Sequence, residues 1–330
     1  MKPMIRSLFA LGPALLLAAA THAQTAEPVE RYPSRPIRIV VPYTPGGQTD
    51  AYARLIAQKL QASWGQNVIV DNRPGANGVI GTDFVMRAPA DGYTLLFTAN
   101  SAHTLGPLLR DPPPFNPVTD FTPVAAAVTY PMYVLSGQHL PARTVPELSE
   151  FARRKADPLT YSTAGAGSAG HIACELFSDA TGIKMRHIPY KGSAPAQLAV
   201  MAGDVDMFCD SVGNSQKLVK EGKIRGLVIT AQSRLAAAPD VPTTQELGMP
   251  DVQVDVWLGL LGPRGMAAPI AAKLNAEVRK LMQSDEVQKR TAAEGTRPAG
   301  LSADEFGQFI RADQDRYAKV IRDKQIRLQN

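Results

Sequence analysis

Short apolar runs alternate with glycine turns and amphipathic segments along this chain, and that alternation constrains its fold more than any other feature. Residues 37–41 are rich in β-branched side chains, a turn with two adjacent glycines follows, and residues 50–63 then have helical spacing of apolar side chains. The same order of strand, turn and helix recurs at 68–70 and 75–86, followed by a strand at 93–98. Repeated units of this kind predict an α/β fold with mostly parallel sheets flanked by helices.

A second series of such units follows a proline-dense connection at residues 112–117. We expect its helices at 145–155, 171–180 and 194–202 and its strands at 160–162, 186–189, 205–209 and 226–230. Two apolar segments, 123–135 and 252–261, are long enough to cross between the series.

The two series predict two lobes, because a mature chain of roughly 300 residues usually exceeds a single core. Lobe one is expected at residues 33–130, with 255–330 returning to it, and lobe two at residues 131–254. The two crossover strands would form the hinge. The C-terminal helices are expected at 270–283 and 303–327, and the second is expected to pack against the protein's own core.

The N-terminus has the pattern of a secretory signal peptide. Lys2 and Arg6 precede an apolar run at residues 8–20 that is too short to span a bilayer. Cleavage is expected after Ala23, which makes residues 1–23 the signal peptide, and cleavage after Ala20 is the alternative. The mature protein is therefore expected in the periplasm, without a lipid anchor because neither cysteine lies near this segment.

Charge and cysteine content exclude several classes of partner. The formal net charge is +5 and no block rich in lysine or arginine appears, so nucleic acid is not an expected partner, whereas a small anion would be weakly attracted. Cys174 and Cys209 have no metal-ligand spacing, and either a disulfide or two buried thiols fits the sequence. We expect a monomer with no metal and no cofactor.

The first glycine turn is a candidate anion site. It follows the strand at 37–41 and begins a helix, where unpaired backbone N–H groups and the helix dipole favour negative charge. Thr49 or Asp50 is expected to cap this helix. Since its carboxylate would repel an anion, Asp50 is expected to orient the turn or to receive an ammonium or hydroxyl group. The ligand-binding candidates here are Tyr43, Gly46, Gly47, Gln48, Thr49 and Asp50.

The second glycine turn, at residues 165–170, matches the G-x-G-x-x-G pattern of dinucleotide sites. The acidic residue that such sites carry after the next strand is missing, because HIPYK stands there at 187–191. We interpret the turn as a second anion-facing helix start. Its candidates are Thr163, Gly167, Ser168 and His171, and they are expected to face the first turn.

Ser168 also supports an alternative of another class, an exported serine hydrolase. The stretch AGSAG at 166–170 approaches a nucleophile elbow, and His171 lies close by. A general base must reach the serine hydroxyl and be oriented by a third group, and the sequence does not place the candidates for these roles, Asp204, Asp206, Asp210 and His187. We favour His171 as a cap or a ligand donor.

Two further candidates follow predicted strands. Ser101 comes after the strand at 93–98, and the carboxyl ends of parallel strands are where open α/β sheets usually bind ligands. Tyr190 follows the strand at 186–189, and its ring and hydroxyl suit both surfaces of a small acid.

Seven stretches in order make the chain resemble the Bug family, the extracytoplasmic solute receptors of tripartite tricarboxylate transporters. These stretches are YPSRPI at 32–37, PGGQTD at 45–50, NRPGA at 72–76, DGYTLL at 91–96, DFTPV at 120–124, PYKG at 189–192 and PDVPT at 239–243.

The resemblance implies a type II periplasmic-binding-protein fold with the ligand between two lobes. It also implies that backbone amides, hydroxyls and waters hold a small carboxylate, which is delivered to a membrane permease. Asp210 is a further ligand candidate, although the preceding Cys209 stands where the family usually has an apolar residue. The motifs do not select one acid among the amino, di-, tri- and aromatic acids that members bind.

Overall fold

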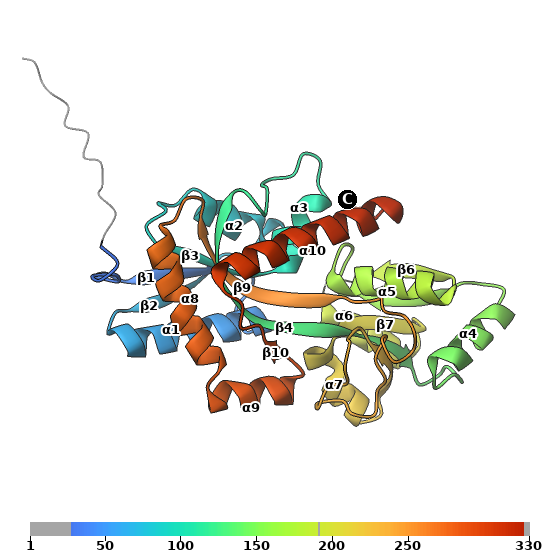
Figure 1. Cartoon of the computed structure of the whole chain (residues 1–330). Helices are drawn as coiled ribbons and strands as arrows, with labels where there is room; N and C mark the ends of the chain where they lie inside the picture. The colour runs from blue at the N-terminus through green and yellow to red at the C-terminus, as the bar shows by residue number, and fades with distance from the viewer. Residues whose placement is uncertain (1–27, 191, 327–330) are drawn as a thin grey trace, which may run out of the picture.

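A computed structural model describes residues 28–190 and 192–326 (Figure 1). The predicted signal peptide, residues 1–23, lies outside the described residues. Within the described ranges, no helix combines the length and apolar character that crossing a membrane requires.

The strands form one sheet system with the order β2-β1-β3-β9-β4-β7-β5-β6, in which β8 and β10 also pair with β4. In lobe one, β1 pairs in parallel with β2 and β3. In lobe two, β5 pairs in parallel with β6 and β7. The predicted α/β fold is therefore confirmed. The bounds are Ile37–Val41 for β1, Val68–Asn72 for β2, Thr94–Ala99 for β3, Leu159–Thr163 for β5, Met185–Pro189 for β6, Met207–Ser211 for β7, Ile224–Ile229 for β8 and Arg297–Pro298 for β10.

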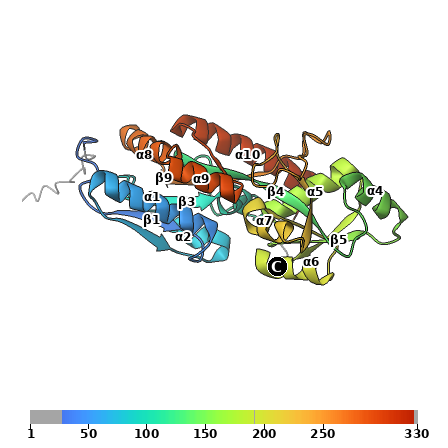
Figure 2. The same cartoon turned by 90° about the horizontal axis from the view of Figure 1, so that it is seen from below.

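Two long strands, β4 (Phe121–Gly137) and β9 (Asp255–Pro263), connect the lobes. All the antiparallel pairs of the sheet system involve one of them. The first part of β4 pairs with β9 as far as Pro131, and from Met132 onward β4 pairs with β7. Figure 2 shows the lobes side by side with β4 running between them. We propose that the lobe boundary lies at its expected position between residues 130 and 131, one residue before this exchange of partners.

Helices cover the sheets where apolar side chains recur at helical spacing. In α1, for example, Tyr52, Ile56 and Leu60 are buried, and the helix ends at Gly65 in the left-handed conformation. A capping box begins α10, in which Ser302 and Glu305 bond each other's backbone N–H. The helices are α1 (Gln48–Trp64), η1 (Ala76–Gly78), α2 (Val79–Met86), η2 (Ser101–Leu105), α3 (Gly106–Leu108), α4 (Val145–Arg154), α5 (Ala169–Thr181), α6 (Ser193–Ala202), α7 (Val212–Lys220), α8 (Ala268–Met282), α9 (Asp285–Glu294) and α10 (Ala303–Asp323).

The helices α7 and α9, the short helices η2 and α3 and the two-residue strand β10 were not predicted from the sequence, and the strands β7 and β9 were predicted two to three residues too early. The first turn of α7 contains Gly213, a weak helix former, so its pattern resembles a loop, yet Ser211 caps it by accepting a hydrogen bond from Asn214 N. Strand β7 begins at Met207 and ends at Ser211, two residues beyond the expected bounds. As a result Asp210 lies within the strand.

The hydrophobic core of lobe one continues into lobe two through α5 and α10. Ile172 and Ala173 of α5 share a buried cluster with Leu258 of β9 and Tyr317 of α10. Figure 1 shows α10 lying along the front of the crossover strands toward α5. The expectation that the terminal helix packs against its own core is confirmed.

A disulfide joins Cys174 of α5 to Cys209 of β7, with a Cα–Cα distance of 6.0 Å. This resolves the alternative that the sequence left open. The helix approaches the strand so closely that a Cβ on Gly170 would lie 2.3 Å from the carbonyl oxygen of Cys209. The bridge therefore fixes the start of α5, and with it the second glycine turn.

Candidate functional site

The first turn leaves the start of α1 open. Gly47 is the N-cap residue and no side chain caps the helix, so the expectation that Thr49 or Asp50 caps it is wrong. Gly46 has φ of +90°, which favours glycine, and a Cβ on Gly46 or Gly47 would have no atom within 4 Å. Because the first N–H groups of a helix have no partner within it, this open position suits an anion.

Asp50 holds the first turn together from inside. Its carboxylate accepts hydrogen bonds from Gly46 N at 3.0 Å, Arg54 Nε at 3.0 Å and Asn72 Nδ2 at 2.9 Å. Burial raises the pKa of Asp50, but these hydrogen bonds and the Arg54 charge outweigh it, so the pKa lies below its usual value. The structure thus gives Asp50 the orienting role, with both carboxylate oxygens engaged.

Gln48 lies beside lobe two. A Cβ on Gly213 would be 3.6 Å from Gln48 Nε2 and 3.2 Å from the carbonyl oxygen of Glu294. The start of α7, which the sequence analysis missed, therefore lies next to the first turn.

Tyr130, on the crossover strand β4, is influenced electrostatically by predicted residues of both lobes. Tyr43 is half-buried and its hydroxyl lies 3.2 Å from Ser101 Oγ. Burial raises the pKa of Tyr130, and nearby Tyr43, Asp210 and Tyr52 raise it further. The charges of Tyr43 of lobe one and Asp210 of lobe two therefore both act on this phenol. The sequence analysis did not select Tyr130; its only signal was a polar aromatic residue directly before Pro131 in an apolar strand.

Asp210 is buried and surrounded by donors from α6 and α7. Ser193 Oγ donates to its Oδ1 at 2.8 Å and Ser215 Oγ to its Oδ2 at 2.9 Å. Gln197 Nε2 and Asn214 Nδ2 add contacts of 3.3 Å each. Burial raises the pKa of Asp210, and these hydrogen bonds oppose the rise. Asp210 thus holds the starts of α6 and α7 in place.

The second turn is organised by Thr163 and Ser168. Thr163 is fully buried, and its Oγ1 lies 3.0 Å from the carbonyl oxygen of Gly165 and 3.2 Å from Gly165 N. Ser168 is half-buried and caps α5 by accepting from His171 N at 3.2 Å, which leaves its hydroxyl proton available to a ligand.

Gly167, in the middle of the second turn, touches lobe one. A Cβ there would lie 1.9 Å from Leu109 Cδ1, just after α3. Tyr190 is half-buried, and its backbone N–H donates to the carbonyl oxygen of Thr163 at 3.2 Å. Gly167 is therefore packed against lobe one, whereas Ser168 and Tyr190 are both half-buried.

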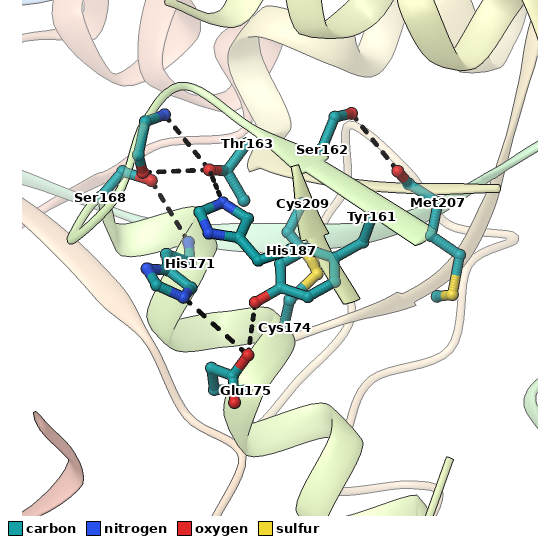
Figure 3. Close-up of a disulfide and its surroundings, with 11 residues drawn as sticks. Tyr161, Ser162, Thr163, Ser168, His171, Cys174, Glu175, His187, Met207 and Cys209 are labelled. Atoms are coloured by element: carbon teal, nitrogen blue, oxygen red, sulfur yellow. Dashed lines mark hydrogen bonds and ion pairs between the residues drawn. A yellow bond between two sulfur atoms is a disulfide. The ribbon is translucent and has the colours of Figure 1, made fainter. Parts of the chain in front are cut away.

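Two imidazoles lie behind the second turn (Figure 3). The His171 and His187 rings stack with centroids 3.9 Å apart, and Tyr161 stacks on His187 at 4.9 Å. Burial lowers the pKa of His171 to about 3, with a contribution from His187, and burial lowers the pKa of His187 to about 4. Both rings are therefore neutral at physiological pH. From the sequence, His187 was considered only as a possible base, and its position beside the second turn was not predicted.

Neither imidazole is arranged to activate Ser168. His171 Nδ1 accepts from Gly167 N at 3.0 Å, and its Nε2 lies 3.9 Å from Glu175 Oε1. His187 Nε2 is bonded to Thr163 Oγ1 at 2.7 Å. Asp206, another candidate for the triad, bonds Thr160 instead, at 2.8 and 3.0 Å. Within the described ranges, no group of three or more histidine, cysteine, aspartate or glutamate side chains could hold a metal ion.

Sequence comparison decides the family. The model of the tripartite tricarboxylate transporter family receptor matches residues 52–326. The chain belongs to this family. BugT of Bordetella pertussis is 34% identical over 304 residues, covering 91% of this chain and 93% of BugT. A protein of Pseudomonas sp. strain P51, encoded between tcbD and tcbE, is 33% identical over 308 residues, with 93% and 91% coverage.

Solved structures of this receptor family have the same fold. Rpa4515 of R. palustris, solved with adipate, has a TM-score of 0.80 and 34% identity, covering 90% of this chain and all of that one. MatC of Rhodopseudomonas palustris, solved with malate, has a TM-score of 0.75 and 32% identity, with 88% and 100% coverage. Members of the family are solute-binding receptors and not enzymes, so the hydrolase alternative is wrong.

Proposed function

We propose that this receptor is a periplasmic protein that closes its two lobes on a small carboxylate and delivers it to the membrane permease of a tripartite transporter. The observation that carries the proposal is the open, uncapped start of α1 at Gly46 and Gly47, where Gln48 lies beside Gly213 of the other lobe. Adipate and malate in two relatives support the ligand class.

The grip would come from neutral donors. In the first lobe these are the backbone N–H groups at the start of α1 and the hydroxyls of Tyr43 and Ser101. In the second lobe the Ser168 hydroxyl is the accessible donor. Asp50, Asp210 and Thr163 support these groups, because their side chains are buried and already engaged.

Native mass spectrometry of the protein purified from a host that exports it would identify a retained acid. A thermal-shift panel of amino, di-, tri- and aromatic carboxylates, including adipate and malate, would follow. We expect at least one acid to raise Tm, as a ligand that binds only the folded state must. The proposal is abandoned if no acid is retained and none raises Tm.

Variants of α5 test the location. Ser168→Ala should weaken binding of the identified acid roughly tenfold, since one hydrogen bond is lost. Ser178→Ala is the matched control, because Ser178 lies on the same helix and bonds the carbonyl oxygen of Ile183 at 2.7 Å, away from the turn. Equal affinities of the two variants would exclude the Ser168 hydroxyl as a ligand donor.

A further inference from the structure

The two imidazoles behind the second turn, that of buried His171 and that of half-buried His187, contact the turn at its start and in its middle. His187 Nε2 contacts Thr163 Oγ1, where the turn leaves β5, and His171 Nδ1 accepts from Gly167 N in the middle of the turn. Thr163 in turn contacts both backbone polar groups of Gly165. The conformation between residues 163 and 168 is therefore fixed by side chains on its inner side.

The contacts require one tautomer of His171. A backbone N–H can only donate, so Nδ1 must carry the lone pair and the ring proton must be on Nε2. Nε2 faces the Glu175 carboxylate at 3.9 Å, and Glu175 also accepts a hydrogen bond from Tyr161. These neighbours come from α5 and β5, and Figure 3 shows Glu175 below the His171 ring and Tyr161 to its right.

The stack gives the rings little room to turn. His187 lies between His171 and Tyr161, with interplanar angles of 23° and 22°. His171 itself is 7% exposed, and the disulfide of the same helix lies one turn further along α5. Ring orientation is therefore set by packing, and the hydrogen-bonding atoms are set with it.

We propose that His171 and His187 are positioning residues for ligand binding, which hold the second turn in its binding conformation through Gly167 N–H and the Thr163 hydroxyl. This inference rests on the proposed function, because it assumes that the turn contacts the ligand. The imidazoles themselves touch the turn from its buried side and carry no direct ligand contact in this assignment.

Isosteric variants separate positioning from packing. The amide of asparagine occupies about the place of Nδ1 and that of glutamine about the place of Nε2. His171→Asn and His187→Gln should therefore retain the required atom, whereas His171→Gln and His187→Asn misplace it. If His171 and His187 only fill space, the asparagine and glutamine variants of each histidine should have the same exchange rates and affinities.

The first measurement needs no ligand. Amide hydrogen exchange at Gly167 should accelerate roughly tenfold in His171→Gln and remain within about threefold of wild type in His171→Asn, since one hydrogen bond is lost in the first variant only. The ¹⁵N chemical shifts of His171 in wild type should report an unprotonated Nδ1 at pH 7. Equal exchange in the two variants, or a protonated Nδ1, would overturn the assignment.

The second measurement is the affinity for adipate and for malate. His171→Gln and His187→Asn should weaken binding roughly tenfold, and His171→Asn and His187→Gln should restore it to within about threefold. If the exchange rates split but the affinities do not, the imidazoles do not position the ligand. If wild type binds neither adipate nor malate, the affinities are compared for the acid of the thermal-shift panel that raises Tm. If no acid of the panel binds, the proposed function fails, while the exchange measurement still decides whether the imidazoles hold the turn.

Discussion

Both glycine turns connect the end of a strand to the start of a helix, yet a charged side chain holds the first turn and neutral side chains hold the second. The first turn is organised by the ionised carboxylate of Asp50, which is paired with Arg54 and Asn72. The second is organised by two neutral imidazoles, His171 and His187, which are stacked on each other. The comparison shows that one kind of backbone site can be supported either by a compensated charge or by uncharged groups.

The turns also differ in their surroundings. Gly46 and Gly47 face open space, whereas Gly167 is covered by Leu109 of the other lobe. The helix after the second turn is additionally tied to β7 by the disulfide. The first turn is therefore preformed by local contacts, and the second depends on the packing around it.

Lowering the pH from 6.5 to 4 should act on the second turn and spare the first. The folded pKa values of His171 and His187, about 3 and about 4, lie below the unfolded value of about 6.5. The unfolded chain therefore binds more protons in this window, and stability falls as pH falls, by up to about 1.4 kcal/mol per pH unit for buried His171 and by less for half-buried His187. Asp50 remains ionised there, because its pKa is lowered.

Urea unfolding between pH 6.5 and 4 measures this slope. The variant His171→Asn with His187→Gln should have a shallower slope than wild type. His103 of lobe one, whose pKa burial lowers to about 4, contributes equally to both proteins and does not affect the difference. An unchanged slope would mean that the imidazoles are not neutral in the folded protein.

Removing the disulfide should be the next largest effect. Cys174→Ala with Cys209→Ala frees a loop of 35 residues and should lower the free energy of unfolding by about 3 kcal/mol. Urea unfolding gives the stability, and hydrogen exchange shows where it is lost. We expect faster exchange at the start of α5 and little change at the start of α1; the reverse pattern would contradict the assignment of the bridge to the second turn.

Asp50→Ala should destabilise the first turn, by somewhat less than the loss of the disulfide destabilises the second. It removes the charged acceptor of the Gly46 N–H and one of the two acceptors of the half-buried Asn72 amide, so we expect a loss of about 2 kcal/mol. Thermal unfolding measures the loss. Asp83→Ala, which removes an exposed partner of Arg87, is the control and should change stability by less than about 0.5 kcal/mol. Similar effects of the two changes would show that Asp50 is not structurally required.

A methyl group added at a turn glycine should have the smallest effect on the free energy of unfolding. The size of this effect should still differ between the two turns. Gly167→Ala introduces a clash with Leu109 at a φ of +72°, so we expect a loss of about 1 kcal/mol, part of which Leu109→Ala in the same chain should recover. Gly47→Ala, with open space at its Cβ, should be nearly neutral. Chemical denaturation compares the variants, and equal losses at both glycines would contradict the difference in their surroundings.

Much of the fold followed from local sequence patterns. The strand at 37–41, the helix starts after both glycine turns and the crossover segments needed only the neighbouring residues to be recognised. The helix α7 was not found, because Gly213 and Asn214 in its first turn are weak helix formers. Candidate residues on the turns themselves were identified from the same local patterns.

The sequence by itself determined which backbone segments form turns at helix starts, because the conformational preferences of glycine and the spacing of apolar side chains act over a few residues. Only the tertiary structure decided what holds each turn. His187 meets Thr163 across 24 residues of chain, and Leu109 meets Gly167 across the two lobes. Hydrogen bonds and packing contacts join atoms in space, so their partners are fixed only when the strands and lobes have been brought together.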